Sequence, residues 1–433
     1  MAQLTIPLSR IEGHARVTIQ FVGSRVLSAH FQATEMRGFE HFVLGAPAQQ
    51  MPVIVPRICG VCSTAHHVAS VKALESAYGV TPPPQAVRIR ELMMLGQLIQ
   101  NQATSLFIFT MPDLPGSEGV PSLFHFDSAD SEIAPKALQV RRGGTRLITL
   151  AGGQFIHPVR AVLGGVTSGL ARQRCDAMRQ EMIDLLPMAE ELLERYWELF
   201  AGLEDRISTL GDDTPTYYLA AVSPGHAYYG GPIRVLAPNG EEQAAFEADA
   251  YSKYLTEVPT EGSYSDGTLF RDELLRANSL ARLNMLPELG TPRAEYWMQR
   301  FRQDWGYPAH AILLFDLARG IELVYAIERA IELLRRDLSN GDMRVAHVPR
   351  DGEGWGVVEA PRGPLIHHYT IREGLVEEAR FVIPTQHNIF AIERALRVAA
   401  ERYITPQGIS LELERAVGRV VRAFDPCIAC ATH

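Results

Sequence analysis

The chain has 433 residues, of which 46% are hydrophobic and 21% charged, a composition typical of a folded protein with a large core. Its 41 basic and 50 acidic side chains give a formal net charge of -9, which disfavours nucleic acid or an anionic membrane as a partner. No membrane span of roughly 20 apolar residues occurs and the start lacks the pattern of a secretory signal, so we expect a cytoplasmic protein.

Hydrophobic periodicity predicts strands near both ends of the chain and helices between them. In the first half of the chain we expect a β-hairpin over 14–33 that turns at Gly23 and Ser24, helices over 61–79 and 84–109, and a loop-rich region over 111–165. A helix over 167–203 follows, which we expect to be kinked or broken near Pro187. The second half is expected to contain short strands over 215–240, a helix over 308–338, strands over 365–371 and 376–384, and two helices from 387 onward. No repeat or linker-like tract interrupts this order. The sequence therefore predicts a mainly α fold of the α+β class, with one large helical domain over residues 1–433 and small β elements.

The five cysteines point to metal or redox chemistry rather than to a disulfide framework, because four of them form two C-x-x-C pairs. Cys59 and Cys62 lie near the start, and Cys427 and Cys430 lie close to the end. Thiolates are soft ligands that favour zinc, iron–sulfur units, copper or nickel. A structural zinc is the alternative interpretation, but almost the whole chain separates these pairs. Cys175, in a helical pattern, is expected to be a small buried hydrophobe.

Further polar residues accompany the cysteines in short motifs. "RIEGH" offers Glu12 and His14, "RGFEHF" offers Glu40, and "EAPRGPLIHHY" offers Glu359 and Arg362. Together with "RICGVCSTAHHVAS", "LARLN", "VIPTQHN" and "DPCIACATH", these motifs make residues 9–433 resemble the large, catalytic subunit of a nickel–iron hydrogenase, in its cytosolic multi-subunit branch.

That resemblance implies a nickel–iron centre held by the four paired cysteines. Cys59 and Cys427 would bind nickel alone, whereas Cys62 and Cys430 would bridge nickel to an iron that carries carbon monoxide and cyanide. The sulfur of Cys427 or Cys430, or alternatively the guanidine of Arg362, would accept a proton from H2.

Residues around the centre receive roles by the same resemblance. Glu12 would be the first proton relay, with a capping or salt-bridge carboxylate as its alternative role. Arg362 would lie over the site; its alternative role is an ion pair that holds Asp425, and the two roles are compatible. Thr385 would donate a hydrogen bond to a cyanide, and His66 would hydrogen-bond a cysteine sulfur and tune the metal.

The chain's end is expected to hold a second, hard metal ion. The resemblance implies magnesium or a similar ion bound by Glu40, the backbone carbonyl of Phe381 and His433. An end at His433 implies a mature form from which an extension was removed, or a gene that ends there. One departure from the better-known members is Asn101, which stands where they carry an acidic residue.

Electrons would have to leave through a partner, because too few cysteines remain for an iron–sulfur cluster and no G-x-G-x-x-G motif follows a strand. We expect an obligate iron–sulfur small subunit, with further electron-transfer subunits for NAD(P), a deazaflavin or a disulfide reductase. The expected activity is reversible oxidation of H2 to protons and electrons. The alternative is an H2-sensing regulatory subunit, whereas retention of all four cysteines disfavours a metal-free structural relative.

Overall fold

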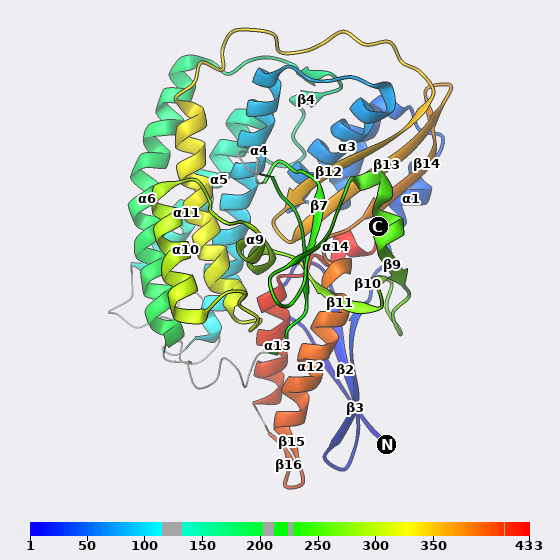
Figure 1. Cartoon of the computed structure of the whole chain (residues 1–433), viewed down its shortest axis with the longest axis vertical. Helices are drawn as coiled ribbons and strands as arrows, with labels where there is room; N and C mark the ends of the chain where they lie inside the picture. Colours follow the sequence, from blue (N-terminus) through cyan, green and yellow to red (C-terminus); the bar gives the residue numbers. More distant parts are fainter. Residues whose placement is uncertain (115–131, 202–211, 224–227, 411) are drawn as a thin grey trace.

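Long helices gather on the left of Figure 1, and most strands lie to their right. The computed structural model describes residues 1–114, 132–201, 212–223, 228–410 and 412–433. The helices in these ranges are α1 (Phe39–Phe42), α2 (Met51–Ile54), α3 (Ser63–Tyr78), α4 (Pro84–Ala103), α5 (Ile133–Gly152), α6 (Arg172–Ala201), α8 (Tyr251–Tyr254), α9 (Ser279–Met285), α10 (Pro292–Trp305), α11 (Leu314–Leu334), α12 (Ile389–Tyr403), α13 (Leu413–Phe424) and α14 (Ile428–Ala431). The strands are β1 (Ala2–Pro7), β2 (Ala15–Val22), β3 (Arg25–Ala33), β4 (Ala161–Val162), β5 (Gly165–Val166), β6 (Tyr217–Ala221), β7 (Ile233–Leu236), β8 (Glu242–Phe246), β9 (Leu255–Val258), β10 (Gly267–Phe270), β11 (Glu273–Arg276), β12 (Gly352–Ala360), β13 (Gly363–Arg372), β14 (Leu375–Val382), β15 (Ile404–Thr405) and β16 (Gly408–Ile409).

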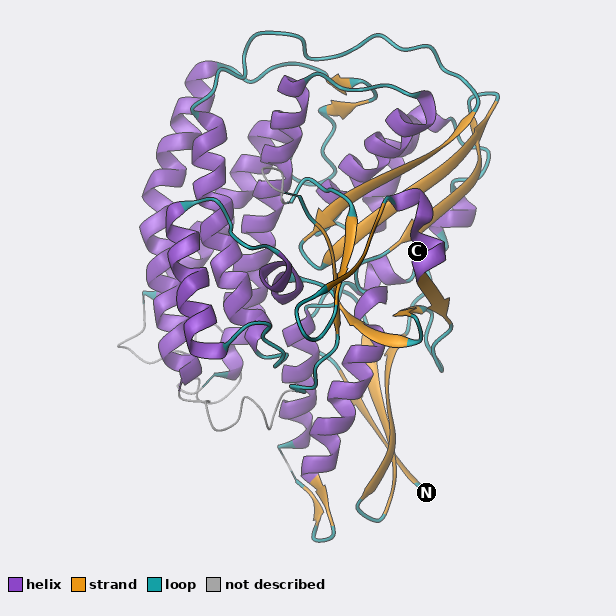
Figure 2. Ribbon diagram, in the orientation of Figure 1, coloured by secondary structure: helices purple, strands orange, loops and turns teal. Residues whose placement is uncertain are grey.

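Helices α4, α5, α6, α10 and α11 stand side by side as a bundle (Figure 2). The bundle forms because each outer helix has an apolar stripe at helical spacing, while α11 is buried along almost its whole length. The helix predicted from residue 167 is present as α6, and it continues unbroken through Pro187. The predicted break is absent because buried residues on both sides of the proline, such as Leu185 and Leu192, hold the helix in the bundle.

The predicted loop-rich region contains a helix, α5, so that part of the prediction was wrong. Residues 115–131 of the same region lie outside the described residues. Glycines suggested a loop, but here they allow helices to touch: a Cβ at Gly144 would lie 2.8 Å from the carbonyl oxygen of Gly96 on α4. Small residues at a helix crossing let two backbones approach closely, which local sequence patterns do not distinguish from turn signals.

Among the described residues, three larger sheets and two two-stranded sheets, β4-β5 and β15-β16, complete the fold. The predicted hairpin is confirmed as β2 and β3, which extend an antiparallel sheet of order β1-β2-β3. The strands predicted over 365–384 are β13 and β14, which pair antiparallel with β12. A third sheet has the order β8-β7-β6-β11-β10-β9. The short strands predicted over 215–240 correspond to β6 and β7, and the sequence did not predict the other four strands.

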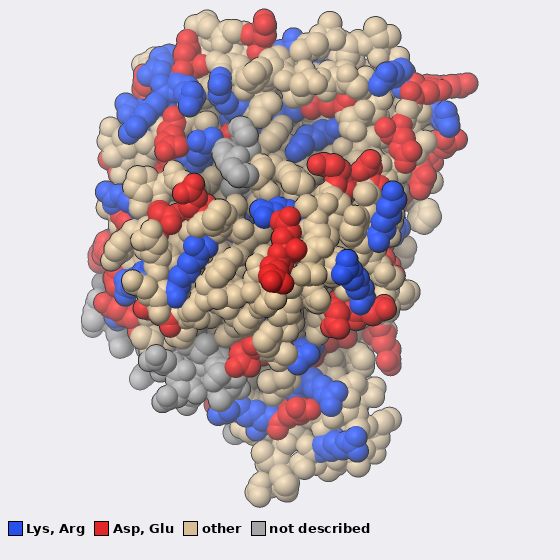
Figure 3. Space-filling view, viewed as in Figure 1, with Lys and Arg blue, Asp and Glu red and all other residues tan. Residues whose placement is uncertain are grey.

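The sheet of β12, β13 and β14 positions the functional residues, because helix α3 packs directly on it. Gly354 and Gly356 of β12 share the face toward α3, where a Cβ on Gly356 would lie 2.2 Å from the carbonyl oxygen of Ala69. The predicted α+β class is thus confirmed. Within the described ranges, no helix combines the length and apolar character needed to cross a membrane. On the face in Figure 3, acidic and basic side chains are interspersed.

Candidate metal centre

The two cysteine pairs meet in the interior although they lie near opposite ends of the sequence. Cys59 and Cys62 precede helix α3, and Cys427 and Cys430 lie at and within α14. All four side chains are buried, and their sulfur atoms lie within 4.8 Å of one another. Individual Sγ–Sγ distances are 3.4 Å from Cys59 to Cys427 and 3.0 Å from Cys427 to Cys430. Four sulfurs at this spacing can share one metal centre.

The thiols have strongly perturbed acidity because they are packed together. Hydrogen bonds from the other three cysteines, with the nearby charge of Arg362, hold the pKa of Cys62 well below its usual range although burial opposes this. Burial raises the pKa of Cys430 well above its usual range. Four adjacent thiolates need a cation to balance their charge, and soft sulfur ligands suit nickel, iron, copper or zinc.

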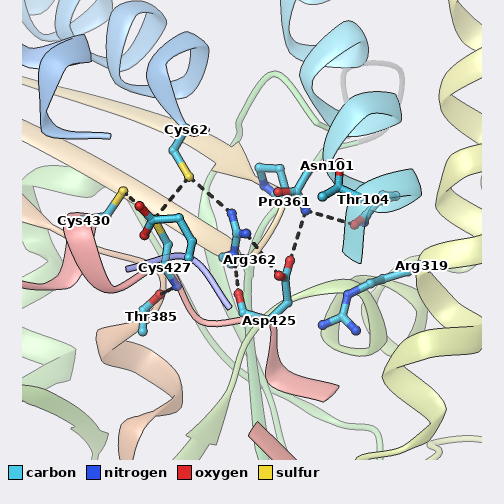
Figure 4. A network of polar contacts seen from close by, with 12 residues as sticks. Cys62, Asn101, Thr104, Arg319, Pro361, Arg362, Thr385, Asp425, Cys427 and Cys430 are labelled. Atoms are coloured by element: carbon cyan, nitrogen blue, oxygen red, sulfur yellow. Dashed lines mark hydrogen bonds and ion pairs between the residues drawn. The ribbon is translucent and has the colours of Figure 1, made fainter. Parts of the chain in front are cut away.

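Arg362 approaches the sulfurs from the turn between β12 and β13 (Figure 4). Its Nη1 donates to Cys62 Sγ at 3.2 Å, and its Nη2 donates to Asp425 Oδ1 at 3.1 Å. The predicted ion pair with Asp425 is therefore confirmed. Asn101 on α4 donates to the other carboxylate oxygen of Asp425 at 3.1 Å, so this departure from the family pattern joins the same network.

Glu12 lies against the second cysteine pair. Its Oε2 accepts hydrogen bonds from Cys427 Sγ and from the backbone N–H of Ala429, both at 3.1 Å. The residue after Glu12 is a glycine because the segment around Glu12 touches the segment around Ile428. Gly13 has a φ of +81°, and a Cβ on Gly13 would lie 2.7 Å from Ile428 Cβ. Burial, and then the charge of the Cys59 thiolate, raise the pKa of Glu12 despite these hydrogen bonds. A carboxyl with a raised pKa beside a sulfur can exchange a proton with it.

Thr385 and His66 contact the same cysteines. The hydroxyl of Thr385 accepts a hydrogen bond from the backbone N–H of Cys427 at 3.0 Å. His66 Nε2 lies 3.3 Å from Cys430 Sγ. His66 is in the first turn of α3, directly after the N-cap residue Cys62. The predicted contact between His66 and a cysteine sulfur is present, and the role of Thr385 toward a cyanide stays a prediction.

The proposed ligands of a second metal also converge. Glu40 Oε1 lies 3.3 Å from His433 Nε2 and accepts the backbone N–H of Phe381 at 2.8 Å. Burial opposes ionisation of Glu40, but the hydrogen bond and charge of His433, with the Phe381 N–H and Arg380, lower its pKa overall. Magnesium binding by the Phe381 carbonyl stays a prediction.

Two residues named from the motifs lie outside the cluster. His14 is exposed and pairs with Glu35. Glu359 is buried beside Arg282, whose guanidinium contacts its carboxylate at 2.6 Å and donates to the Pro361 carbonyl at 2.8 Å. Arg282 thus supports the turn that carries the site arginine, a role that sequence reasoning missed although the "LARLN" motif contained the residue.

Known proteins share both the motifs and the fold. The family profile described as nickel-dependent hydrogenase matches residues 37–110 and 223–433, and one described as HoxL-like matches residues 3–36. The chain is 36% identical over 409 residues to a polypeptide of the vhu F420-non-reducing hydrogenase of Methanocaldococcus jannaschii, covering 91% of this chain and 97% of that protein. It is 29% identical over 457 residues to the beta subunit of the NAD-reducing hydrogenase HoxS of Cupriavidus necator, covering 99% and 93%.

Solved structures agree with these relatives. A NAD+-reducing NiFe-hydrogenase in the H2-reduced state superposes with a TM-score of 0.94 at 33% identity, over 100% of both chains. The Ni-Fe-Se hydrogenase from D. vulgaris Hildenborough, at 22% identity and a TM-score of 0.83, has the same fold. Membership of a family that depends on nickel favours nickel over a structural zinc at the cysteines. The chain belongs to the nickel-dependent hydrogenase family, as a large, catalytic subunit of the nickel–iron type that acts on H2.

Proposed function

We propose that this chain is the catalytic subunit of a cytoplasmic hydrogenase that oxidises H2 reversibly and passes the electrons to an iron–sulfur partner subunit. The observation that carries the proposal is the contact between Glu12 and Cys427, at 3.1 Å, beside four buried sulfurs. It provides in one place soft ligands for a redox metal and a group that can remove a proton.

The donor set fits a nickel–iron centre. Cys59 and Cys427 would hold nickel, and Cys62 and Cys430 would bridge nickel to an iron that carries carbon monoxide and cyanide. When bound, this centre supplies the redox chemistry that separates H2 into two protons and two electrons. The support for the assignment is four buried thiols within 4.8 Å in a chain of a nickel-dependent family.

The chain's own residues would move the proton. Glu12 accepts a hydrogen bond from Cys427 Sγ, so it is placed to take a proton that arrives at this sulfur. Burial raises its pKa, which brings the carboxyl closer to a neutral working pH. Glu12 is also partly exposed, so the same carboxyl can release the proton toward the surface.

Arg362 and Thr385 would orient the ligands on the iron. Asp425 and the thiolates raise the pKa of Arg362 against the effect of burial, so the guanidinium keeps its charge. Its N–H groups are directed toward Cys62 and Asp425, and a charged donor fixed in this way stabilises negative charge at the site. Thr385 supports the backbone of Cys427 and would offer its hydroxyl hydrogen to a cyanide.

Glu40, the Phe381 carbonyl and His433 would hold a magnesium ion or a similar hard cation. The lowered pKa of Glu40 favours the carboxylate that such an ion requires, and His433 Nε2 faces the same oxygen. An ion at this position would fix the end of the chain next to the segment that carries Cys430.

An iron–sulfur subunit would dock where apolar side chains are exposed beside the metal centre. Met36, Phe42, Leu44 and Val53 are 65%, 71%, 46% and 46% exposed, and they lie in the segment that leads directly to Cys59. Exposed apolar groups of this size are typical of protein interfaces. Further electron-transfer subunits, for NAD(P), a deazaflavin or a disulfide reductase, would follow. The NAD-reducing name of one relative supports the first of these, whereas the F420-non-reducing name of another gives no support to a deazaflavin.

Infrared spectroscopy of the purified complex tests this function. We expect a carbonyl band and a pair of cyanide bands that shift under H2. A blank spectrum from a fully matured sample that contains zinc would refute the nickel–iron assignment. Rapid H2-dependent reduction of an electron acceptor would distinguish the enzyme from an H2-sensing subunit, in which turnover is slow.

A further inference from the structure

A continuous chain of hydrogen-bonding groups leads from Cys430 into the protein. Cys430 Sγ lies 3.3 Å from His66 Nε2, and His66 Nδ1 lies 2.9 Å from His367 Nε2. His367 Nδ1 lies 2.9 Å from the hydroxyl oxygen of Tyr369, which lies 3.0 Å from Ser70 Oγ. These hydrogen bonds join α3 to β13, so the series exists because that helix packs on the sheet.

The imidazoles in this chain are neutral because they are deeply buried. His66, His367, Tyr369 and Ser70 each have a relative exposure of 0%. A neutral imidazole has one nitrogen that donates and one that accepts. The tautomer of each histidine therefore depends on its neighbour.

Only two alignments satisfy every link. When Tyr369 donates to Ser70, His367 donates to Tyr369 and His66 donates to His367. His66 Nε2 then carries no hydrogen and accepts only from a Cys430 thiol. When Cys430 is a thiolate, His66 Nε2 has to donate to it, so every donor reverses and Tyr369 donates to His367.

We propose that Tyr369 is a positioning residue whose hydroxyl, acting through His367, selects the tautomer of His66 and thereby sets the hydrogen bond that the Cys430 thiolate receives. This rests on the proposed function, in which Cys430 is a metal ligand. A hydrogen bond to a ligating sulfur withdraws electron density from it and tunes the metal. Linked hydrogen bonds also polarise one another, so the Tyr369 hydroxyl affects the hydrogen bond between His66 and Cys430 although it contacts neither residue.

Two substitutions at the end of this hydrogen-bonded series farthest from Cys430 should act in the same direction. Tyr369→Phe removes the donor to His367 and weakens the bond to the sulfur, so more electron density reaches the metals. The carbonyl band should then move to lower wavenumber, because a more electron-rich iron donates more density into carbon monoxide. In the thiolate alignment Ser70 donates to Tyr369, so Ser70→Ala weakens the hydrogen bond that Tyr369 gives to His367 and should also move the band to lower wavenumber, by less than Tyr369→Phe.

The experiment records infrared spectra of the purified holo-complex for the wild type and each variant. Tyr78→Phe is the matched control, because Tyr78 lies on the same helix as Ser70 and its buried hydroxyl has no hydrogen-bond partner among the described residues. We expect its bands to coincide with those of the wild type. Nickel and iron analysis of each sample shows that a shift does not reflect partial loading.

The outcomes separate this inference from the proposed function. A wild-type complex without carbonyl and cyanide bands removes the proposed function. If the wild type shows these bands, and the carbonyl band of Tyr369→Phe lies at the same or a higher wavenumber, only the role of Tyr369 is overturned. If Tyr369→Phe does not bind the metals, Ser70→Ala decides: a shift to lower wavenumber supports the inference, and an unchanged or raised band overturns it.

Discussion

Replacing Glu12 with glutamine isolates the proton-transfer step, because the two side chains have the same size. The carboxylate accepts from Cys427 Sγ and from the Ala429 N–H, both at 3.1 Å. The amide oxygen of glutamine can still accept the Ala429 N–H, so the local backbone keeps its support. An amide does not take up a proton near neutral pH, however. We therefore expect H2/D+ exchange to fall by about 10²- to 10⁴-fold, the usual contribution of a positioned acid or base.

Mass-spectrometric H2/D+ exchange and nickel analysis on the same sample check this prediction. Nickel content should equal that of the wild type, because the substitution leaves the four thiols unchanged. Glu35→Gln is the control, since that carboxylate is exposed and pairs with His14 at the surface. Wild-type exchange by a nickel-loaded Glu12→Gln complex would refute the relay, and loss of nickel from it would assign Glu12 a structural role instead.

Three further predictions concern the metal, the pH dependence of stability and the helix bundle. Cys430→Ala should abolish nickel binding, whereas Cys175→Ala, at a buried cysteine outside the cluster, should leave the nickel content unchanged in metal analysis. Burial raises the pKa of Glu359 from 4.5 to about 7, so the folded state binds this proton more tightly than the unfolded chain. The free energy of unfolding should therefore decrease by up to about 3 kcal/mol as the pH rises through this interval. Denaturation series at about pH 5 and pH 8 measure this decrease, and it should be smaller in Glu359→Gln, which cannot bind the proton. Gly144→Ala should destabilise the protein by about 1–3 kcal/mol because its Cβ meets the α4 backbone. A Cβ at Gly143 meets the ends of flexible side chains, Leu185 Cδ1 at 2.2 Å and Met182 Cε at 3.3 Å, so Gly143→Ala should cost less in the same denaturation assay.

Local patterns predicted the elements that are long or strictly alternating. The hairpin of β2 and β3, the strands β13 and β14, and the helices α3, α4 and α11 follow from the spacing of apolar residues. Patterns failed where a residue's meaning depends on a distant neighbour. Gly144 indicated a loop because no local feature distinguishes a turn glycine from one at a helix crossing. Pro187 indicated a kink or a break because the packing that keeps α6 helical through this residue comes from other helices.

The sequence by itself determined the chemistry of the site: two C-x-x-C pairs supply soft ligands, and their flanking motifs identify the family. Tertiary structure alone decided which atoms meet. It placed Glu12 against Cys427 and connected Tyr369 to Cys430 through two histidines. The physical reason is that ligand type is a property of each side chain, whereas a hydrogen bond requires two groups within about 3 Å of each other. For residues hundreds of positions apart, only the packing of the whole core fixes that distance.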